Sequence, residues 1–485
     1  MGSLLATPLL VLGAMAAALL AWLAMAGAVQ WTGRRDHGRL HWIFPAMLGL
    51  LALGVLLSGR DLTTDHALDE FMALGPAPTR HPVVAAVQPV LSLLLLAVSG
   101  ERLLSHLLAR QRAPLHLLMP LGFVFFWLGS TASPALLGAH PQHSHDYLYP
   151  LVIGLAAALS SPRELEMAVR TLRNSLLLFM LGGVALAVLA PTRALDMNYG
   201  QGLLPGLARF AGLAMHPVSM GLLAQLGLLC LLAQPFERRW LQRAAWALGL
   251  GVLVMAQSKT AWLAFVLCSA ALLAWRQGPS LGRRLADPLR PDTGMALVMG
   301  AMALVIAVAG LALFGQVGER LDRFFSTPEG AQLASLTGRD RIWAIAWDEW
   351  SRNPVFGYGP ELWGPAFRQS IGMVSATHAH NQFMDTLSRA GLVGAVSLCL
   401  YAALLLVLSL RHARDTRGLS VALFLALLLR AMSEVPLLLF GYGPELITHV
   451  LLLMTLSAAA QNRASRPVRS AAAMPDPLAR QRQQA

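Results

Sequence analysis

The chain has 485 residues, of which 56% are hydrophobic and only 13% are charged, and its formal net charge is +12. Soluble domains carry about 25% charged residues, so this composition excludes an ordinary soluble protein. A basic chain often binds nucleic acid, but here the arginines stand in short segments between apolar runs, where they orient membrane helices. The composition therefore predicts a protein surrounded by membrane lipids, with no nucleic-acid partner.

Apolar runs follow one another along nearly the whole chain. A membrane-spanning helix needs about 20 apolar residues, and several of the runs are shorter than that. Backbone polar groups in lipid must be satisfied within their own segment, so each run is predicted to form a helix. The predicted fold class is an all-α polytopic membrane protein with about 12 (12–13) transmembrane helices. The runs are 4–28, 42–58, 82–99, 115–131, 147–160, 173–190, 211–233, 243–257, 260–275, 294–314, 391–410, 419–435 and 445–460.

Arginines gather in every second connection between these runs, beginning with Arg34, Arg35 and Arg39 after the first run. Arginine-rich connections are expected on the cytoplasmic side of the membrane. The alternate connections then face outward, and the largest of them is 315–390. The N-terminus lies outside if the first run spans the membrane, and inside if it does not.

These features divide the chain into four predicted parts. Residues 1–314 hold the N-terminal transmembrane helices, 315–390 form an outward loop subdomain with the polar motifs, and 391–460 hold the C-terminal transmembrane helices. Residues 461–485 are rich in Pro, Arg and Gln and almost free of large apolar residues. This composition predicts a disordered, basic cytoplasmic tail.

The large loop begins its polar motifs near residue 336. Thr337 to Asp340 read as a weak capping box, and a helix should follow because Trp343, Trp347 and Trp350 recur at helical spacing. Arg339 and Arg341 then stand in the first turn of that helix, where backbone N–H groups and the helix dipole favour anions. The alternative is that the tryptophans anchor the loop in the membrane interface and the arginines are only solvated.

A turn and a pair of histidines follow. Asn353-Pro354 ends the predicted helix, and 357–360 make a Gly-rich turn within a heptapeptide, 356–362, that recurs at 440–446. The string 377–382 then contains His378, His380 and Asn381. A histidine can take up a proton near neutral pH. The two histidines could instead ligate a metal with Asp385 as the third ligand, although an isolated His-x-His pair is a weak metal signal.

Further charges stand beside the apolar runs. Arg209 opens the run 211–233 and His216 follows within it, while Lys259, the only lysine of the chain, sits between two short runs. An ionisable group at membrane depth costs about 2.5–3.5 kcal/mol, so it indicates function unless it is the solvated tip of a tight outward hairpin. Arg430 and Glu434, four residues apart on one run, are predicted to pair with each other.

Together these strings resemble the O-antigen ligase/polymerase family of bacterial envelope glycosyltransferases. The resemblance rests on Thr337-Gly338-Arg339 with Trp343, Gly357-x-Gly359, His380-Asn381 with the apolar turn to Gly391, Arg209-x-x-Gly212 with Pro217, and Ser258-Lys259. It covers about 205–395. One position departs from the family pattern, which usually reads Ser-Arg: Lys259 keeps the positive charge but lacks the bidentate fork of arginine.

The resemblance implies a GT-C-like fold in the bacterial inner membrane, with the active site facing the periplasm. It implies transfer of a glycan from undecaprenyl pyrophosphate to a hydroxyl of lipid A–core, as an O-antigen ligase does, with no cofactor and no metal. His380 would be the general base of an inverting reaction. The pyrophosphate would be bound by Arg209, Lys259, Arg339 and Arg341, with support from His378, Asn381 and His216.

Other functions fit the same sequence. An O-antigen polymerase or a protein O-glycosyltransferase of the same family would use the same donor and a different acceptor. A membrane transporter or lipid flippase would also have about twelve helices and intramembrane charges. The two halves of the chain show no convincing repeat, and a long ordered loop bearing His and Arg is unusual for a transporter, so an enzyme is favoured.

Overall fold

The computed structural model describes residues 39–62, 81–108, 117–197, 204, 206–285, 339–374 and 376–464. The described chain is predominantly helical, as predicted. One departure from an all-α fold is a pair of short antiparallel strands, β1 (Leu195–Asp196) and β2 (Arg209–Phe210). The predicted runs 4–28 and 294–314, the residues Thr337 and Gly338, and the tail from 465 onward lie outside the described residues.

The helices follow the predicted runs in order. Before the large loop they are α2 (Ile43–Leu57), α4 (Pro82–Leu108), α5 (Leu118–Trp127), α6 (Ser133–Leu137), α7 (Leu148–Ala157), α8 (Pro162–Leu189), α9 (Pro191–Ala194), α10 (Pro217–Ala233), α11 (Arg239–Met255) and α12 (Lys259–Leu285). Short helical turns are η1 (Leu40–Trp42), the π-helical η2 (Leu128–Ala132) and η3 (His145–Tyr147). Then come α16 (Arg339–Arg352), α17 (Pro365–Ser370), α18 (Gln382–Arg411), α19 (Leu419–Ala431) and α20 (Glu445–Ala464).

Several of these helices can cross a bilayer. Six helical segments of the described chain are long and apolar enough to do so: Leu40–Leu57, Pro82–His106, Leu118–Leu137, Pro162–Leu189, Lys259–Gln277 and Gln382–Arg411. α10 and α19 are apolar but shorter. Large apolar side chains point outward on these helices; Val188 and Leu189 of α8 are 78% and 83% exposed. Such a surface suits lipid rather than water. The chain is therefore a multi-pass membrane protein, and the count of twelve spans stays a prediction.

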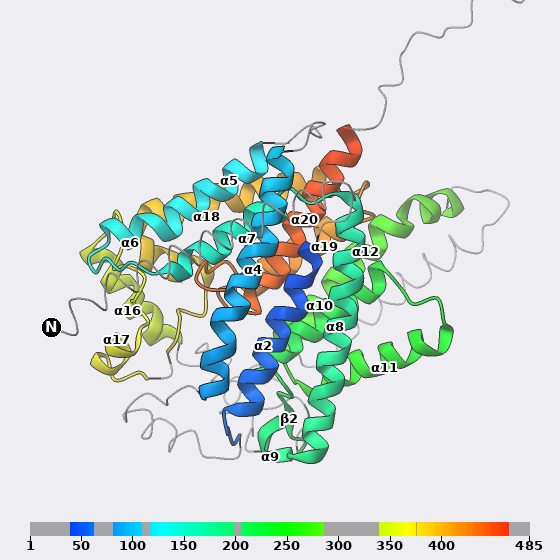
Figure 1. Cartoon of the computed structure of the whole chain (residues 1–485), viewed down its shortest axis with the longest axis horizontal. Helices are drawn as coiled ribbons and strands as arrows, with labels where there is room; N and C mark the ends of the chain where they lie inside the picture. Colours follow the sequence, from blue (N-terminus) through cyan, green and yellow to red (C-terminus); the bar gives the residue numbers. More distant parts are fainter. Residues whose placement is uncertain are drawn as a thin grey trace, which may run out of the picture.

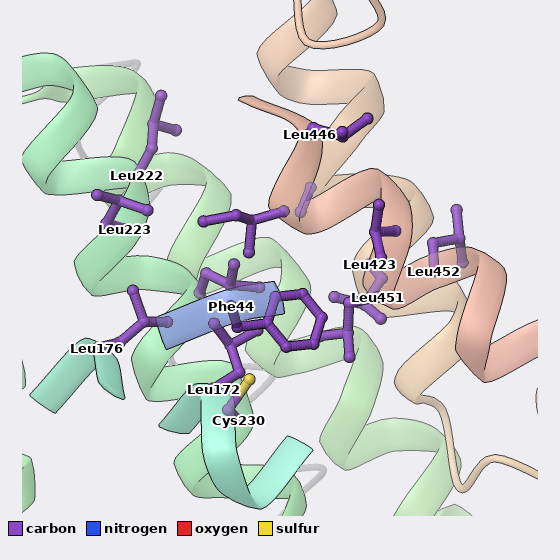
Figure 2. Packing of buried hydrophobic residues seen from close by; sticks show 14 of the residues in the cluster. Phe44, Leu172, Leu176, Leu222, Leu223, Cys230, Leu423, Leu446, Leu451 and Leu452 are labelled. Carbon is purple, nitrogen blue, oxygen red and sulfur yellow. The ribbon is translucent and has the colours of Figure 1, made fainter. Parts of the chain in front are cut away.

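The core of the bundle surrounds α20. Residues 446–460 of this helix are all buried, as expected for a helix that is apolar on every side. Figure 2 shows Leu446, Leu451 and Leu452 of α20 within a cluster of buried apolar side chains from several helices. The partners in that view are Phe44 of α2, Leu172 and Leu176 of α8, Leu222, Leu223 and Cys230 of α10, and Leu423 of α19.

Arginine-rich connections meet at one end of this bundle. Arg102 of α4 pairs with Glu164 at the start of α8 at 3.0 Å. Arg173 of α8 donates to the carbonyl of Gln234 after α10, and Arg276 of α12 donates to the carbonyl of Leu232 at 2.6 Å. These three contacts join four connections that the charge pattern assigns to one side of the membrane. Figure 1 shows α16 and α17 away from the end where α12 and α20 finish.

This arrangement predicts the outcome of surface labelling. A cysteine at Gln369 of α17 should react with an impermeant maleimide on intact spheroplasts, because Gln369 is exposed in the loop that the charge pattern predicts to face outward. A cysteine at Arg239, exposed at the start of α11, should react only after lysis. The parent protein should have its three native cysteines replaced, because Cys399 is exposed on α18. The reverse labelling pattern would invert the topology.

Two predicted helix boundaries are corrected by the structure. The run 211–233 does not begin as a helix: α10 starts at Pro217, with His216 as its N-cap, because proline is tolerated in the first turn but breaks a helix interior. Arg209 lies in β2, not at a helix start. The run 391–410 belongs to the longer α18, which has non-helical backbone angles at Gly391.

Candidate active site

The described part of the large loop has a small apolar cluster of its own. α16 follows the predicted helical spacing, and its buried residues include Ile342 and Ala346, one turn apart. They pack with Leu362, Trp363 and Ala379 in a cluster separate from the membrane core. Trp343, on the side of α16 that faces this cluster, donates from Nε1 to the carbonyl of Ala379 at 2.8 Å. The first two turns of α16 are thus held against the histidine segment.

The Gly-rich turn 357–360 is joined to a break in α18. The amides of Tyr358 and Gly359 donate to the carbonyls of Ser388 and Arg389, both at 2.9 Å. Gly391 has φ +62°, and a Cβ there would collide with the backbone at Val355. Only glycine adopts this conformation without strain and allows so close an approach. The break therefore fixes the turn beside the segment that enters α18.

His378 and His380 meet a carboxylate from a distant part of the chain. Nε2 of His378 lies 3.2 Å from Oε2 of Glu434, and Nδ1 of His380 lies 3.8 Å from the same oxygen. Glu434 lies between α19 and α20. The two rings are 4.2 Å apart and nearly perpendicular. All three side chains are partly exposed, between 20% and 30%, so a substrate can reach them.

The ring nitrogens of the two histidines differ in their hydrogen bonds. Nδ1 of His378 accepts a hydrogen bond from the backbone N–H of His380 at 3.1 Å, so the proton of the neutral ring belongs on Nε2, which faces Glu434. Both ring nitrogens of His378 are therefore occupied. Nδ1 of His380 lies 3.8 Å from the same oxygen of Glu434, beyond hydrogen-bond distance, and has no hydrogen-bond partner among the described residues. Catalytic hydrogen bonds are often long before substrate binds.

The backbone around His380 is strained and then capped. His380 has φ +50°, a left-handed conformation that costs a non-glycine residue about 1–3 kcal/mol and is found most often at functional sites. Asn381 follows as the N-cap of α18, and its Oδ1 accepts from the amides of Phe383 and Met384 at 3.0 and 3.1 Å. Asn381 thus supports the site by fixing the helix start directly after His380.

Glu434 is not the partner of Arg430, and the predicted pair is wrong. α19 ends at Ala431, so Glu434 is not on the same helix face, and Arg430 pairs with Glu445 at 3.3 Å instead. Burial alone would raise the pKa of the Glu434 carboxyl, but the interactions with His378 and His380 outweigh burial and hold that pKa below its usual range. Glu434 is therefore an anion at neutral pH.

Arg339 and Arg341 lie in the first turn of α16, as predicted. Arg339 is four residues before Trp343 and so shares its face of the helix, the face that touches Ala379. Arg341 is exposed and makes only a long contact, 3.5 Å, to the carbonyl of Ile371. Of the two arginines, Arg339 is the more buried.

Arg209 and Lys259 lie together near a different turn. Nε of Arg209, which is 6% exposed, donates to the carbonyl of Ala256 at 3.1 Å. The structure fits the alternative of a tight hairpin: α11 ends at Met255, and Lys259 is exposed at the start of α12. His216 begins α10, whose Gly221 packs closely on Ser258 in the same turn. The structure thus places the four candidate cations in two sets on different elements.

A metal ion could also be held by this cluster. Ligand atoms of His378, His380 and Glu434 lie within 4.8 Å of one another. The third ligand would be Glu434 and not Asp385, as the sequence suggested. Asp385 accepts from the amide of Ala379 at 3.0 Å and pairs with Arg389 at 2.8 Å, so its carboxylate has a structural role.

The fold and this cluster define a multi-pass helical membrane protein with a histidine–carboxylate group in the connections beside α16, α18 and α20. Residues 244–399 match the family model described as O-Antigen ligase, which supports membership of the chain in the O-antigen ligase/polymerase family. The match contains Lys259, Arg339 and both histidines, whereas Arg209 and Glu434 lie outside it. No curated protein matches the chain.

Sequence reasoning missed Glu434 as a member of the site. The sequence did point to it, because Glu434 is an acidic residue at the end of an apolar run, next to a connection predicted to face outward. It stands four residues after Arg430, however, which offered a simpler local partner. Its true partners are more than 50 residues away in the chain.

Proposed function

We propose that this protein is an O-antigen ligase, which transfers a glycan from undecaprenyl pyrophosphate to a hydroxyl of lipid A–core at the periplasmic face of the inner membrane. The observation that carries the proposal is the cluster of His378, His380 and Glu434 beside the first turns of α16. It offers a proton acceptor on the segment that packs against α16, the helix whose first turn contains Arg339 and Arg341. The family match supports a lipid-linked glycan donor and a lipid acceptor in general.

His380 is the general base of the proposed reaction. The acceptor hydroxyl oxygen bonds to the anomeric carbon of the donor while the bond from that carbon to the pyrophosphate oxygen breaks. The hydroxyl proton passes to Nε2 of His380, and undecaprenyl pyrophosphate leaves with the electron pair. Glu434 stabilises the imidazolium that forms. A direct attack of this kind inverts the anomeric configuration.

The cations are proposed to bind the pyrophosphate, whose negative charge grows as the glycosidic bond breaks. Arg339 is supported most directly, because α16 is held against the residue before His380. Arg341 and Lys259 stand near the starts of α16 and α12, where backbone N–H groups add to the positive potential. Arg209 lies in β2 and contacts the turn before α12. Fixed cations can meet the charge of the leaving group, so the reaction is proposed to need no metal and no cofactor.

The transfer itself can be tested with purified protein in nanodiscs. Mixed with lipid-linked glycan and lipid A–core in excess EDTA, the protein should produce glycan-bearing lipid A–core, visible as slower bands on a gel. Activity restored by one particular divalent ion would contradict metal independence and make the histidine–carboxylate cluster a metal site. Joining of two glycans on the lipid carrier would indicate a polymerase, and movement of the lipid without a new covalent product would indicate a flippase.

Lys259 gives a test of the cation proposal. If its charge binds the pyrophosphate, Lys259→Ala should lower transfer by about tenfold or more, since a hydrogen bond to a charged group contributes about 1.5–3 kcal/mol. Lys259→Arg should keep most of the activity because the charge remains. The measurement is the rate at low donor concentration, in variants with equal expression. Full activity of Lys259→Ala would show that Lys259 is an exposed hairpin residue without a role in binding the pyrophosphate.

A further inference from the structure

A cavity of about 280 Å³ lies beside the histidine segment. Its wall includes Thr377, three residues before His380, and Leu438, which follows Glu434 in the same connection. The opposite wall is formed by η2 and by Tyr147 at the end of η3. The cavity is thus built by the two segments that carry the proposed base and its carboxylate.

The cavity wall contains buried polar atoms without partners. The hydroxyl of Tyr147 and Nε1 of Trp363 are shielded from solvent and make no hydrogen bond with the described part of the chain, and the two side chains are only 6% and 4% exposed. Leaving such a group unpaired costs about 1–3 kcal/mol. Burial, with the nearby Glu361 carboxylate, raises the pKa of Tyr147 to about 12, so its hydroxyl keeps its proton at neutral pH. Both groups are therefore donors whose hydrogen bonds the described residues leave unsatisfied.

The charges of the wall disfavour a phosphate. Arg389 is the cation of the wall, but it is paired with Asp385 at 2.8 Å and also donates to the carbonyl of Pro360. Glu361, a second charged group of the wall, is an acceptor and would repel an anion. A hydrocarbon chain is disfavoured as well, since it would leave the carboxylate and the two buried donors without partners.

The wall has the features that a sugar ring needs. Tyr147, Trp363 and Phe440 offer flat apolar faces for the C–H surface of a pyranose, and Glu361 offers acceptors for its hydroxyls. Drug-sized ligands occupy pockets of about 300–1,000 Å³, so this smaller cavity suits one ring rather than a longer glycan. Ser130 and Thr131 enter the wall from the π-helical η2, and π-helical turns occur frequently at functional sites.

We infer that this cavity binds one uncharged saccharide unit of a glycan substrate and places it next to His380. The inference rests on the proposed glycan transfer and names the part of a substrate that the site selects. The unit belongs either to the donor glycan or to the acceptor, because both present the same hydroxyl-rich ring.

Two conservative variants test the inference by kinetics. Tyr147→Phe removes one hydroxyl from the wall, and Glu361→Gln removes the charge. With donor and acceptor varied separately, the apparent KM of one of them should rise about threefold to tenfold for Tyr147→Phe and about tenfold or more for Glu361→Gln. The substrate whose KM rises is the one that contains the sugar ring bound in the cavity. Tyr149→Phe is the matched control, because Tyr149 is also buried, lies two residues away and is absent from the cavity wall. Unchanged KM values for both substrates in both variants would overturn the inference.

A binding measurement separates this inference from the proposed reaction. Saturation-transfer difference NMR with free glucose, galactose and N-acetylglucosamine needs no turnover. At least one sugar should give signals with the wild-type protein and with Tyr149→Phe, and these signals should fall at least threefold with Glu361→Gln. Inorganic pyrophosphate should not displace the sugar. Sugar signals without any transfer activity would refute the proposed function and still support sugar binding in the cavity. Equal signals in all variants, or no signal in any of them, would refute sugar binding in the cavity.

Discussion

His380→Ala is expected to lower the turnover of glycan transfer by about 10²–10⁴-fold, which is the contribution of a positioned general base. The apparent affinity for the lipid-linked donor should change little, because no proton is transferred when the donor binds. The expected result follows from the hydrogen bonds: His380 keeps one ring nitrogen for substrate, while both nitrogens of His378 are occupied. The measurement is single-turnover transfer together with donor binding by the same purified variant.

His378→Ala is the matched control, since it removes the same ring two residues away. It should lose about tenfold, because His378 positions Glu434 and the backbone of His380 without accepting the substrate proton. A nearly inactive His378→Ala with a nearly normal His380→Ala would move the base to His378. Full activity of both variants would remove histidine from the chemistry.

Glu434→Gln should reduce turnover by about 10–100-fold while the thermal stability of the protein stays close to that of the wild type. A hydrogen bond to a charged group contributes about 1.5–3 kcal/mol, and this carboxylate faces the imidazolium that forms in the proposed reaction. The acidic limb of the pH–rate profile should also move to lower pH, because a protonated histidine loses the negative neighbour that stabilises it. The measurement is the turnover number from pH 5 to 9, a range that includes the ordinary histidine titration.

Glu445→Gln is the control for this variant. Glu445 stands in the same region at the start of α20, is 40% exposed and pairs with Arg430, not with a histidine. Its loss should leave turnover and the pH profile unchanged. If Glu434→Gln and Glu445→Gln behaved alike, the carboxylate would have only a structural role.

The repeated heptapeptide shows the limit of local sequence. In the first copy, Leu362 packs in the loop cluster and Glu361 enters the cavity wall. In the second copy, Leu446 packs in the membrane core and Glu445 pairs with Arg430. Identical residues thus have different partners, because the partners come from whichever helices lie nearby. A turn composition predicts a turn and says nothing about what the turn contacts.

The sequence by itself determined the properties that depend on composition and on spacing along one helix. Long apolar runs specified a polytopic helical membrane protein, because unpaired backbone groups cannot stay in lipid, and the tryptophan spacing specified α16. His378, His380 and Asn381 were found because they are neighbours in the chain. The tertiary structure alone decided what lies beside them. The packing of α18, α19 and α20 brings Glu434 to the histidines, and the break at Gly391 fixes the turn beside them. The tertiary structure also separates the four candidate cations into two sets, because the distant neighbours of a side chain are set by how helices pack and not by sequence spacing.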